Sequence, residues 1–267
     1  MSATPLLTDQ MRAATKSDHD KSDKLVNLKL ALVLTSPALY GEALGLFLPV
    51  FETMESIIDR NSKHPQIGKL HPMMDILRRT PGFRSDLEYY LPGDRRQELE
   101  KAWKNGENAV IKEYVEHLEK LEKEDPVRVL AYAYHLNGGV LAGGQIISRM
   151  VRKAMGLPNN QEEGVMVFKV KDEASMSNKG VFQKVKSIFN EELELSAESK
   201  QALIQEGKEV FRLNNALVST VKGTQAWDQA ADAFTKKILL ICCVILACYF
   251  AWHVFALGSG GILQHGY

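Results

Sequence analysis

The C-terminal end of the chain constrains its fold more than any other feature. No Lys, Arg, Asp or Glu occurs after Lys237, and residues 238–257 read ILLICCVILACYFAWHVFAL. A helix of this length rises about 30 Å, the thickness of a bilayer's hydrocarbon core. Lysines precede it, and Tyr249 and Trp252 lie toward its far end, as expected at the two interfaces. The pattern predicts one transmembrane helix, because a soluble core helix rarely stays apolar on all sides for five turns.

The other end of the chain sets the expected orientation. The N-terminal sequence MSATPLLTDQMR contains no apolar signal core. We therefore expect a tail-anchored protein with three parts: a cytosolic domain over residues 1–235, a membrane anchor over residues 236–258 and a short tail over residues 259–267.

Charge and cysteine placement exclude several classes of protein. The chain carries 33 basic and 33 acidic residues, and no long basic run marks a nucleic-acid partner. All three cysteines, Cys242, Cys243 and Cys248, lie in the apolar end. The charged part therefore has no disulfide framework and no cysteine-ligated metal site. Cys242 and Cys243 serve either as apolar filler or as palmitoylation sites.

Apolar spacing in the charged part is helical almost throughout, which predicts an all-α, single-domain fold. Only residues 165–170, which read VMVFKV, favour an extended segment. The helical stretches are predicted at residues 7–14, 37–60, 94–121 and 125–155, with short helices over 68–92 and a long helix after Ser196.

Four glycines interrupt one of these helical stretches. Residues 132–145 read YAYHLNGGVLAGGQ, and each glycine costs about 1 kcal/mol relative to alanine inside a helix. The segment is either a loop between two helices or a kinked helix whose backbone lies directly on a ligand, where a Cβ would collide. Apolar flanking residues favour the kinked helix.

The first helix carries a second unusual pattern. Arg12, Lys16 and His19 are spaced four and three residues apart, so they share one helix face. The histidine could bind a metal while the cations bind carboxylates. The alternative is a solvated polar face, and the spacing alone favours it because Asp18 and Asp20 flank His19.

Together these segments resemble the heme oxygenase family along most of residues 8–225. The segments that carry the resemblance are LTDQMRAATKSDHDKSD at the first helix, FRSDLEYYLPG over residues 83–93, LAGGQ over residues 141–145 and VFRLNNAL over residues 210–217. The hydrophobic C-terminal anchor is typical of the animal members. The resemblance implies an all-α heme oxygenase-like fold with a kinked distal helix, followed by one C-terminal transmembrane helix.

The resemblance also implies roles for individual residues. His19 would be the proximal iron ligand of heme b, and Gly139 and Gly143 of the distal helix would lie against the heme. The other heme contacts would be Arg12, Lys16 and Lys186 at the propionates, with Tyr134, Phe211 and Asn214 around the ring.

The implied activity is cleavage of heme to biliverdin with release of iron and carbon monoxide. Heme is then both substrate and cofactor, and the reaction uses dioxygen and electrons from NADPH through a partner reductase. With its anchor, such an enzyme would lie in the endoplasmic reticulum membrane and face the cytosol.

One residue departs from the family's pattern. Val140 stands where the distal motif has an aspartate, and a valine cannot hydrogen-bond a distal water. Asn137 is the better placed residue to replace this aspartate, and His135 is the second candidate. The alternative is that both are ordinary polar residues at the surface. Two other functions therefore stay open: a heme-binding or heme-sensing protein with little turnover, and a tail-anchored helical adaptor.

Overall fold

A computed structural model describes residues 5–170, 176–221 and 235–237. All regular elements in these ranges are helices, which confirms the predicted all-α fold. The predicted transmembrane helix lies outside the described residues. None of the described helices is long and apolar enough to cross a membrane.

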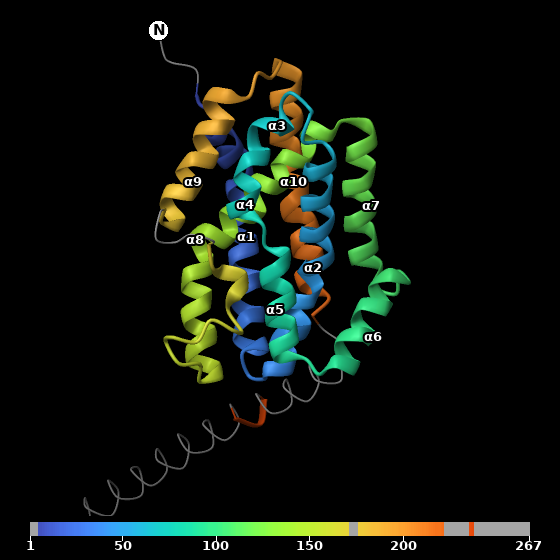
Figure 1. Ribbon diagram of the computed structural model, residues 1–267, viewed down its shortest axis with the longest axis vertical. Coiled ribbons are helices and arrows are strands. Elements are labelled where there is room, and N and C mark those ends of the chain that lie inside the picture. Colours follow the sequence, from blue (N-terminus) through green and yellow to red (C-terminus); the bar gives the residue numbers. More distant parts are fainter. Residues whose placement is uncertain (1–4, 171–175, 222–234, 238–267) are drawn as a thin grey trace, which may run out of the picture.

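Five long helices form the body of the domain (Figure 1). Residues 37–60 form α2 with the bounds that the sequence predicts. The five are α1 (Leu7–Val33), α2 (Pro37–Arg60), α7 (Ala109–Glu124), α8 (Val129–Met155) and α10 (Ala197–Ser219). Apolar residues from all five meet in one core.

Shorter elements connect and flank the long helices. Between α2 and α7 lie α3 (Ile67–Leu70), η1 (His71–Met73), α4 (Met74–Leu77), α5 (Thr80–Tyr90) and α6 (Gly93–Lys104). Around α8 and α10 lie η2 (Pro126–Arg128), η3 (Met166–Phe168), α9 (Asn178–Ser187) and η4 (Ile188–Glu192). The stretch at residues 165–170 is therefore a single turn rather than a strand.

Helix boundaries follow capping residues. The predicted continuous helix over residues 94–121 is wrong, because Gly106 adopts a φ of 68° between α6 and α7. Asn108 then starts α7 by accepting hydrogen bonds from the N–H groups of Val110 and Ile111, each at 3.1 Å. Ser196 caps α10 as predicted, accepting from the Ser199 N–H at 3.1 Å.

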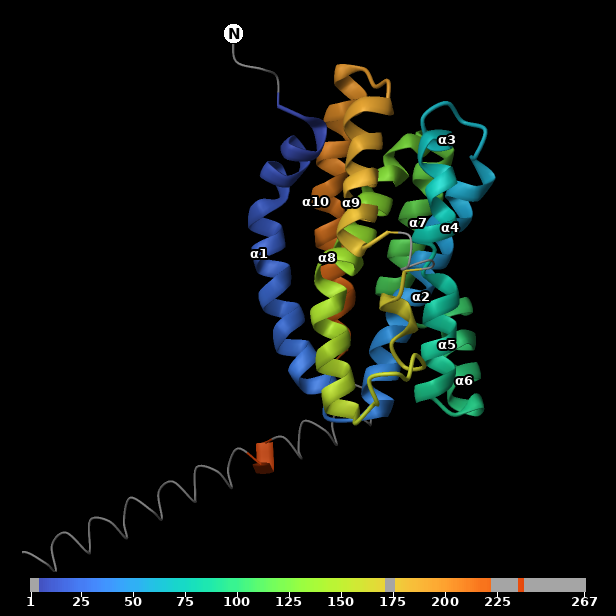
Figure 2. The same cartoon turned by 60° about the vertical axis from the view of Figure 1, so that its left-hand side comes forward.

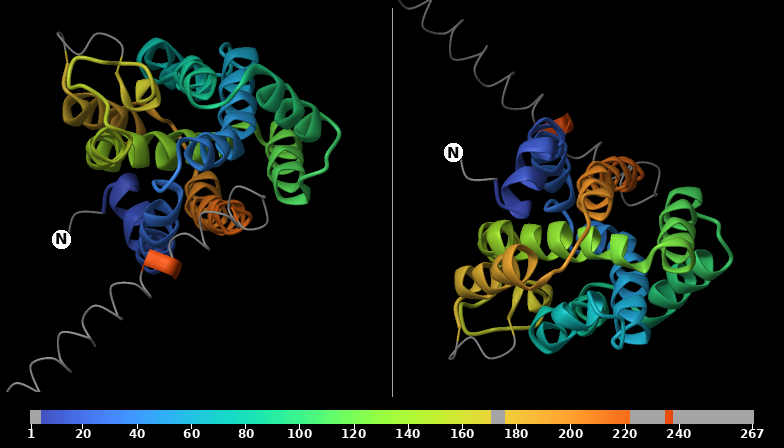
Figure 3. Two further views of the ribbon diagram at one scale, coloured as in Figure 1. Left: turned by 90° about the horizontal axis from the view of Figure 1, so that it is seen from below. Right: turned by 90° about the horizontal axis from the view of Figure 1, so that it is seen from above.

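The glycine-rich segment is one helix. α8 continues through all four glycines from Val129 to Met155, and it bends along its course, as Figures 1 and 3 show. Of the two alternatives that the sequence left open, the kinked helix is confirmed. Glycine pairs are a recognised cause of such bends.

The helix α1 lies along α10 on the outside of the bundle (Figure 2). Its first turn is fixed by Asn190 in η4. The Thr8 N–H donates to Asn190 Oδ1 at 3.0 Å, and Asn190 Nδ2 donates to Thr8 Oγ1 at 3.1 Å. These contacts hold the start of α1 against the end of α9.

A buried carboxylate joins α7, η2, α8 and α10. Glu206 of α10 accepts from Tyr132 Oη at 2.7 Å and from Arg128 Nε at 3.0 Å, and His117 Nε2 lies 2.7 Å from it. Burial opposes ionisation of Glu206, but the hydrogen bonds from His117 and Tyr132 and the charge of Arg128 hold its pKa below the usual value. The carboxylate is therefore ionised at neutral pH.

We expect Glu206→Gln to lower the free energy of unfolding at pH 7 by about 3 kcal/mol, because it removes a buried carboxylate and leaves the partly buried Arg128 without its ion-pair partner. Urea denaturation measures the change. Glu113→Gln is the matched control: its partner Arg212 and Glu113 itself are half exposed, so the loss should stay below about 1 kcal/mol.

The same pair of variants has a defined pH dependence. Because the folded pKa of Glu206 is lowered, the stability that its charge contributes is lost as pH falls through that pKa. The difference between wild type and Glu206→Gln should therefore narrow in acid. Equal losses in Glu206→Gln and Glu113→Gln at pH 7 would contradict this role for Glu206.

Candidate functional site

The four glycines of α8 have two different surroundings. A Cβ at Gly138 would lie 3.0 Å from the Phe182 ring, and one at Gly144 would lie 2.8 Å from the Phe168 ring. These two glycines let neighbouring elements pack closely on the helix. A Cβ at Gly139 or Gly143 would meet nothing within 4 Å, so these two leave open space beside the backbone.

The open space continues as an apolar surface along the helix. Gly139, Gly143, Ile146 and Met150 are spaced four, three and four residues apart, so they share one face of α8. Ile146 is 56% exposed and Met150 is 41% exposed. Exposed apolar side chains gathered on one helix face mark a surface that binds an apolar partner.

Phe211 of α10 connects this face to α1. Its ring centroid lies 5.7 Å from that of His19 on α1 and 5.2 Å from that of His135 on α8. His135 precedes Gly139 by four residues, so it lies on the open face of α8. We call His19, His135, Gly139, Gly143 and Phe211 the α1–α8 site.

His19 has a carboxylate beside one of its ring nitrogens. Its side chain is 58% exposed, and Nδ1 lies 3.1 Å from Asp23 Oδ2. A carboxylate beside Nδ1 favours the tautomer with its proton on Nδ1, in which the lone pair of a neutral imidazole is on Nε2. No group of three or more His, Cys, Asp or Glu in the described ranges could hold a metal ion. A metal at His19 would therefore need most of its ligands from outside the protein.

Cationic groups gather beside Tyr134 at the start of α1. Burial and the charge of Asp9 raise the pKa of Tyr134 to about 12, although its hydrogen bond with Thr8 and the charge of Arg12 oppose this rise. The Tyr134 ring lies 5.6 Å from that of Phe182.

Lys186 of α9 contacts the same Phe182 ring, with Nζ 5.0 Å from its centroid. Arg12 of α1 is close enough to Tyr134 for its charge to affect the Tyr134 hydroxyl. Lys16 pairs with Asp20 at 3.9 Å, and both are largely exposed, so this pair is weak and Lys16 is available to an anion.

Comparison with known proteins decides the family. The sequence model described as heme oxygenase matches residues 6–220. The chain belongs to the heme oxygenase family. Heme oxygenase 2 of Rattus norvegicus is 24% identical over 242 residues, covering 87% of this chain and 69% of the relative. Heme oxygenase 1 of Nostoc sp. is 23% identical over 218 residues, covering 81% and 86%.

Solved structures of heme oxygenases share the fold. Heme oxygenase 2 of Chlamydomonas reinhardtii, solved without heme, has a TM-score of 0.75 and 28% identity, covering 83% of this chain and all of that one. Heme oxygenase-1 of the cyanobacterium Synechocystis, solved in complex with heme, has a TM-score of 0.73 and 21% identity, covering 88% and 100%.

Within this heme oxygenase fold, Asn214 is oriented by a residue that sequence reasoning missed. Tyr114 Oη donates to Asn214 Oδ1 at 2.9 Å, which fixes the amide with its oxygen toward Tyr114 and its nitrogen on the other side. Tyr114 is fully buried, and burial raises its pKa well above 10, which keeps the hydroxyl a donor. Asp23 was missed as well, although a carboxylate four residues after a histidine on a helix is a recognisable signal.

The structure shows how the two polar residues near Val140 are packed. Asn137 is 1% exposed; its Nδ2 donates to the Ala133 carbonyl oxygen at 3.0 Å, and its Oδ1 is buried without a hydrogen-bond partner among the described residues. It lies two residues from Gly139 and therefore on the opposite side of α8. His135, not Asn137, shares the face of Gly139. Val140 is partly buried and packs against the core.

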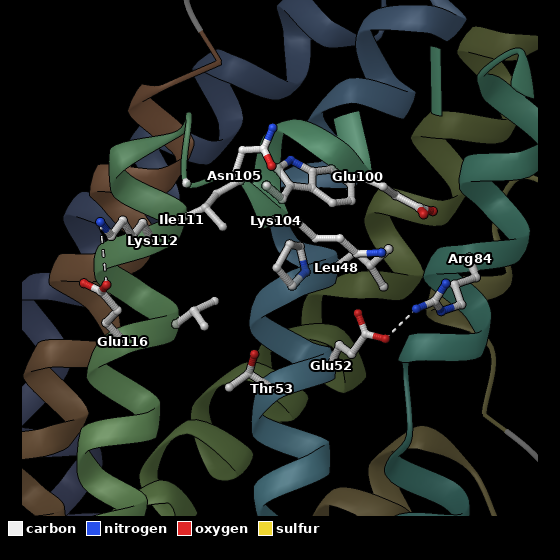
Figure 4. Close-up of a pocket in the computed structure, with 14 residues that line it drawn as sticks. Leu48, Glu52, Thr53, Arg84, Glu100, Lys104, Asn105, Ile111, Lys112 and Glu116 are labelled. Carbon is white, nitrogen blue, oxygen red and sulfur yellow. Dashed lines mark hydrogen bonds and ion pairs between the residues drawn. The ribbon is translucent and has the colours of Figure 1, made fainter. Parts of the chain in front are cut away.

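A separate pocket of about 570 Å³ lies between α2, α5, α6 and α7 (Figure 4). Leu48, Trp103 and Ile111 line it, and ion pairs between Glu52 and Arg84 and between Lys112 and Glu116 lie at its edges. None of the family's expected heme contacts lines this pocket. Its lining also contains no histidine.

Alanine substitutions at two neighbouring glycines test whether α8 has one open face and one closely packed face. We expect Gly143→Ala to raise the stability of the heme-free protein by up to about 1 kcal/mol, because alanine favours the helix and its Cβ meets open space.

Gly144→Ala is the matched variant. It should lower stability by about 1–3 kcal/mol, because its Cβ would lie 2.8 Å from Phe168. Urea denaturation measures both changes, and shifts of the same sign would show that the two faces of α8 are not distinct.

Proposed function

We propose that this chain binds heme in the α1–α8 site and oxidatively cleaves it to biliverdin, releasing iron and carbon monoxide. The observation that carries this proposal is the pairing of a bare, open stretch of α8 at Gly139 and Gly143 with the Nε2 lone pair of His19, held by Asp23. A flat, apolar ligand with one metal ion fits this combination. Heme, after which the matched family is named, is such a ligand.

The residues of the site then have separate tasks. His19 binds the iron, and Asp23 orients and polarises the imidazole. Arg12, Lys16 and Lys186 pair with the two propionates and so fix the in-plane orientation of the heme. Gly139 and Gly143 leave room for dioxygen beside the backbone.

The heme supplies the redox chemistry when it is bound, and the protein supplies orientation and proton donors. The amide nitrogen of Asn214, which Tyr114 holds through Oδ1, is a donor for water or dioxygen in the site. Electrons come from NADPH through a partner reductase. We further propose that residues 238–257 anchor the chain in the endoplasmic reticulum membrane with the catalytic domain facing the cytosol.

Val140 favours a second function, in which the protein holds or senses heme and turns it over slowly. A valine cannot hold the water that delivers a proton, and Asn137, the expected substitute, lies on the other side of the helix. Heme binding does not depend on residue 140, because the ligand, the cations and the apolar face are all present.

We expect His19→Ala to abolish the six-coordinate ferric spectrum of the heme complex, because the imidazole that binds iron is lost. Absorption and electron paramagnetic resonance (EPR) spectra of the full-length protein measure this. His71→Ala is the control, since His71 pairs with Asp59 on the surface far from α1. An unchanged spectrum in His19→Ala would exclude His19 as the ligand.

We expect wild type to form biliverdin slowly and Val140→Asp to form it faster by about tenfold or more, since a positioned acid group contributes roughly 10²–10⁴ in rate. A single-turnover assay with heme, reductase and NADPH measures the products. Val140→Asn is the matched control: it is polar and similar in size to aspartate but cannot deliver a proton. Equal rates in all three proteins would mean that residue 140 has no part in proton delivery.

A further inference from the structure

Asp86 on α5 is a buried carboxylate that the proposed function leaves unexplained. Its side chain is 0% exposed, and no cation pairs with it in the part of the chain that the structure describes. Its partners are backbone groups: the Met166 N–H donates to Oδ1 at 2.8 Å, and the Val167 N–H donates to Oδ2 at 2.9 Å. A buried carboxylate without a cation is costly, so its presence calls for an explanation.

We propose that Asp86 is a positioning residue for the α1–α8 site. It fixes η3, and η3 seats the ring of Phe168 against Gly144 of α8. This contact sets the position of the open face of the helix at Gly139 and Gly143. The effect on bound heme rests on the proposed function, whereas the connection from Asp86 through η3 to α8 does not.

The first step is the attachment of η3 to α5. Met166 and Val167 begin the turn, so their N–H groups have no partner within it, and Asp86 accepts from both. The backbone of η3 lies so close to α5 that a Cβ at Gly82 would be 2.8 Å from the Met166 carbonyl oxygen. The carboxylate therefore satisfies the turn at the point where it packs on the helix.

The second step is the contact of η3 with α8. A Cβ at Gly144 would lie 2.8 Å from Cδ1 of Phe168, so the ring occupies the space that the glycine leaves. The Phe168 carbonyl oxygen accepts from Gln145 Nε2 at 3.3 Å. Gly143, one residue before Gly144, faces open space. Because close-packed interiors transmit small displacements, a shift of Phe168 moves the face of α8 that meets the ligand.

The charge of Asp86 makes this attachment dependent on pH. Burial raises the pKa of Asp86 to about 6, although hydrogen bonds from backbone N–H groups of η3 and Gly164 oppose the rise. The groups that face it are phenols: Tyr40 of α2, whose buried Oη has no hydrogen-bond partner among the described residues, and Tyr90 of α5. The charge of Arg152 on α8 affects Tyr90.

The direction of the pH dependence follows from the raised pKa. When η3 leaves α5, water reaches Asp86, and its pKa falls toward the ordinary value of 3.8. The attached state therefore binds a proton more readily than the detached state. Attachment strengthens as pH falls through about 6 and weakens as pH rises. Glu206 behaves in the opposite way, because its pKa is lowered.

Amide hydrogen exchange of the full-length, heme-free protein tests the attachment. Protection of residues 164–170, corrected for the intrinsic pH dependence of exchange, should rise by about tenfold from pH 7.5 to pH 5. Asp86→Asn should lower this protection and remove its pH dependence, because an amide has one acceptor oxygen for two N–H groups and does not titrate.

Glu88→Gln is the matched control for the exchange measurement. Glu88 lies on the same helix as Asp86, its side chain is 75% exposed, and its carboxylate is 3.7 Å from Arg96. This variant should keep the wild-type protection and pH profile.

The heme complex tests the second step. Loosening Phe168 lets α8 move away from the ligand, so carbon monoxide should bind the reduced complex about threefold faster or more in Asp86→Asn and in Phe168→Ala. Phe168→Leu replaces Phe168→Ala if the latter does not fold. Because Asp86 acts through Phe168, the double variant should bind the gas no faster than the Phe168 variant alone.

The outcomes separate this inference from the proposed function. The inference is wrong, while heme binding stands, if Asp86→Asn keeps the wild-type exchange profile, leaves carbon monoxide binding unchanged, or multiplies the effect of the Phe168 variant. If the exchange profile is as expected but wild type binds no heme, the proposed function is wrong, and with it the claim that Asp86 positions a heme site.

Discussion

The candidate site depends on a helix, α8, that lacks a side chain at two neighbouring positions of one face, Gly139 and Gly143. α8 must be close to Phe182 and Phe168 on one side and open on the other, and the four glycines meet both demands. Each glycine weakens the helix, and the packing of the bundle has to offset that cost. A side chain at Gly138 or Gly144 would push the neighbouring elements away, whereas one at Gly139 or Gly143 would fill the space that a ligand needs.

A buried carboxylate helps to hold α8 in place. Glu206 connects α10 to α8 through Tyr132, to α7 through His117 and to η2 through Arg128, so these four elements are held together. α1 is held differently. It lies along α10 and is fixed at its start by Asn190, while His19 itself is exposed. A buried network thus holds α8 and α10 together, whereas His19 lies exposed on α1.

Much of the fold follows from local patterns. Apolar spacing predicts α2 with its observed bounds, and Ser196 marks the start of α10. The glycine segment could be assigned to a kinked helix from its apolar flanks. The helix over residues 94–121 could not be predicted correctly, because charge-rich helices and turns have similar composition there and the break depends on the backbone of Gly106.

The sequence by itself determined the all-helical class, the separation of an uncharged C-terminal end from the charged domain, and the motifs that place the chain in its family. Tertiary structure alone decided how the polar groups of α8 are packed. Counting residues from Val140 favoured Asn137 as a substitute for the missing aspartate; the fold buries Asn137 with its Nδ2 bonded to the Ala133 carbonyl, and it packs His135 against Phe211 and Gly207. The physical reason is that a helix presents several faces, and the packing of the other helices against α8 determines which of them are covered.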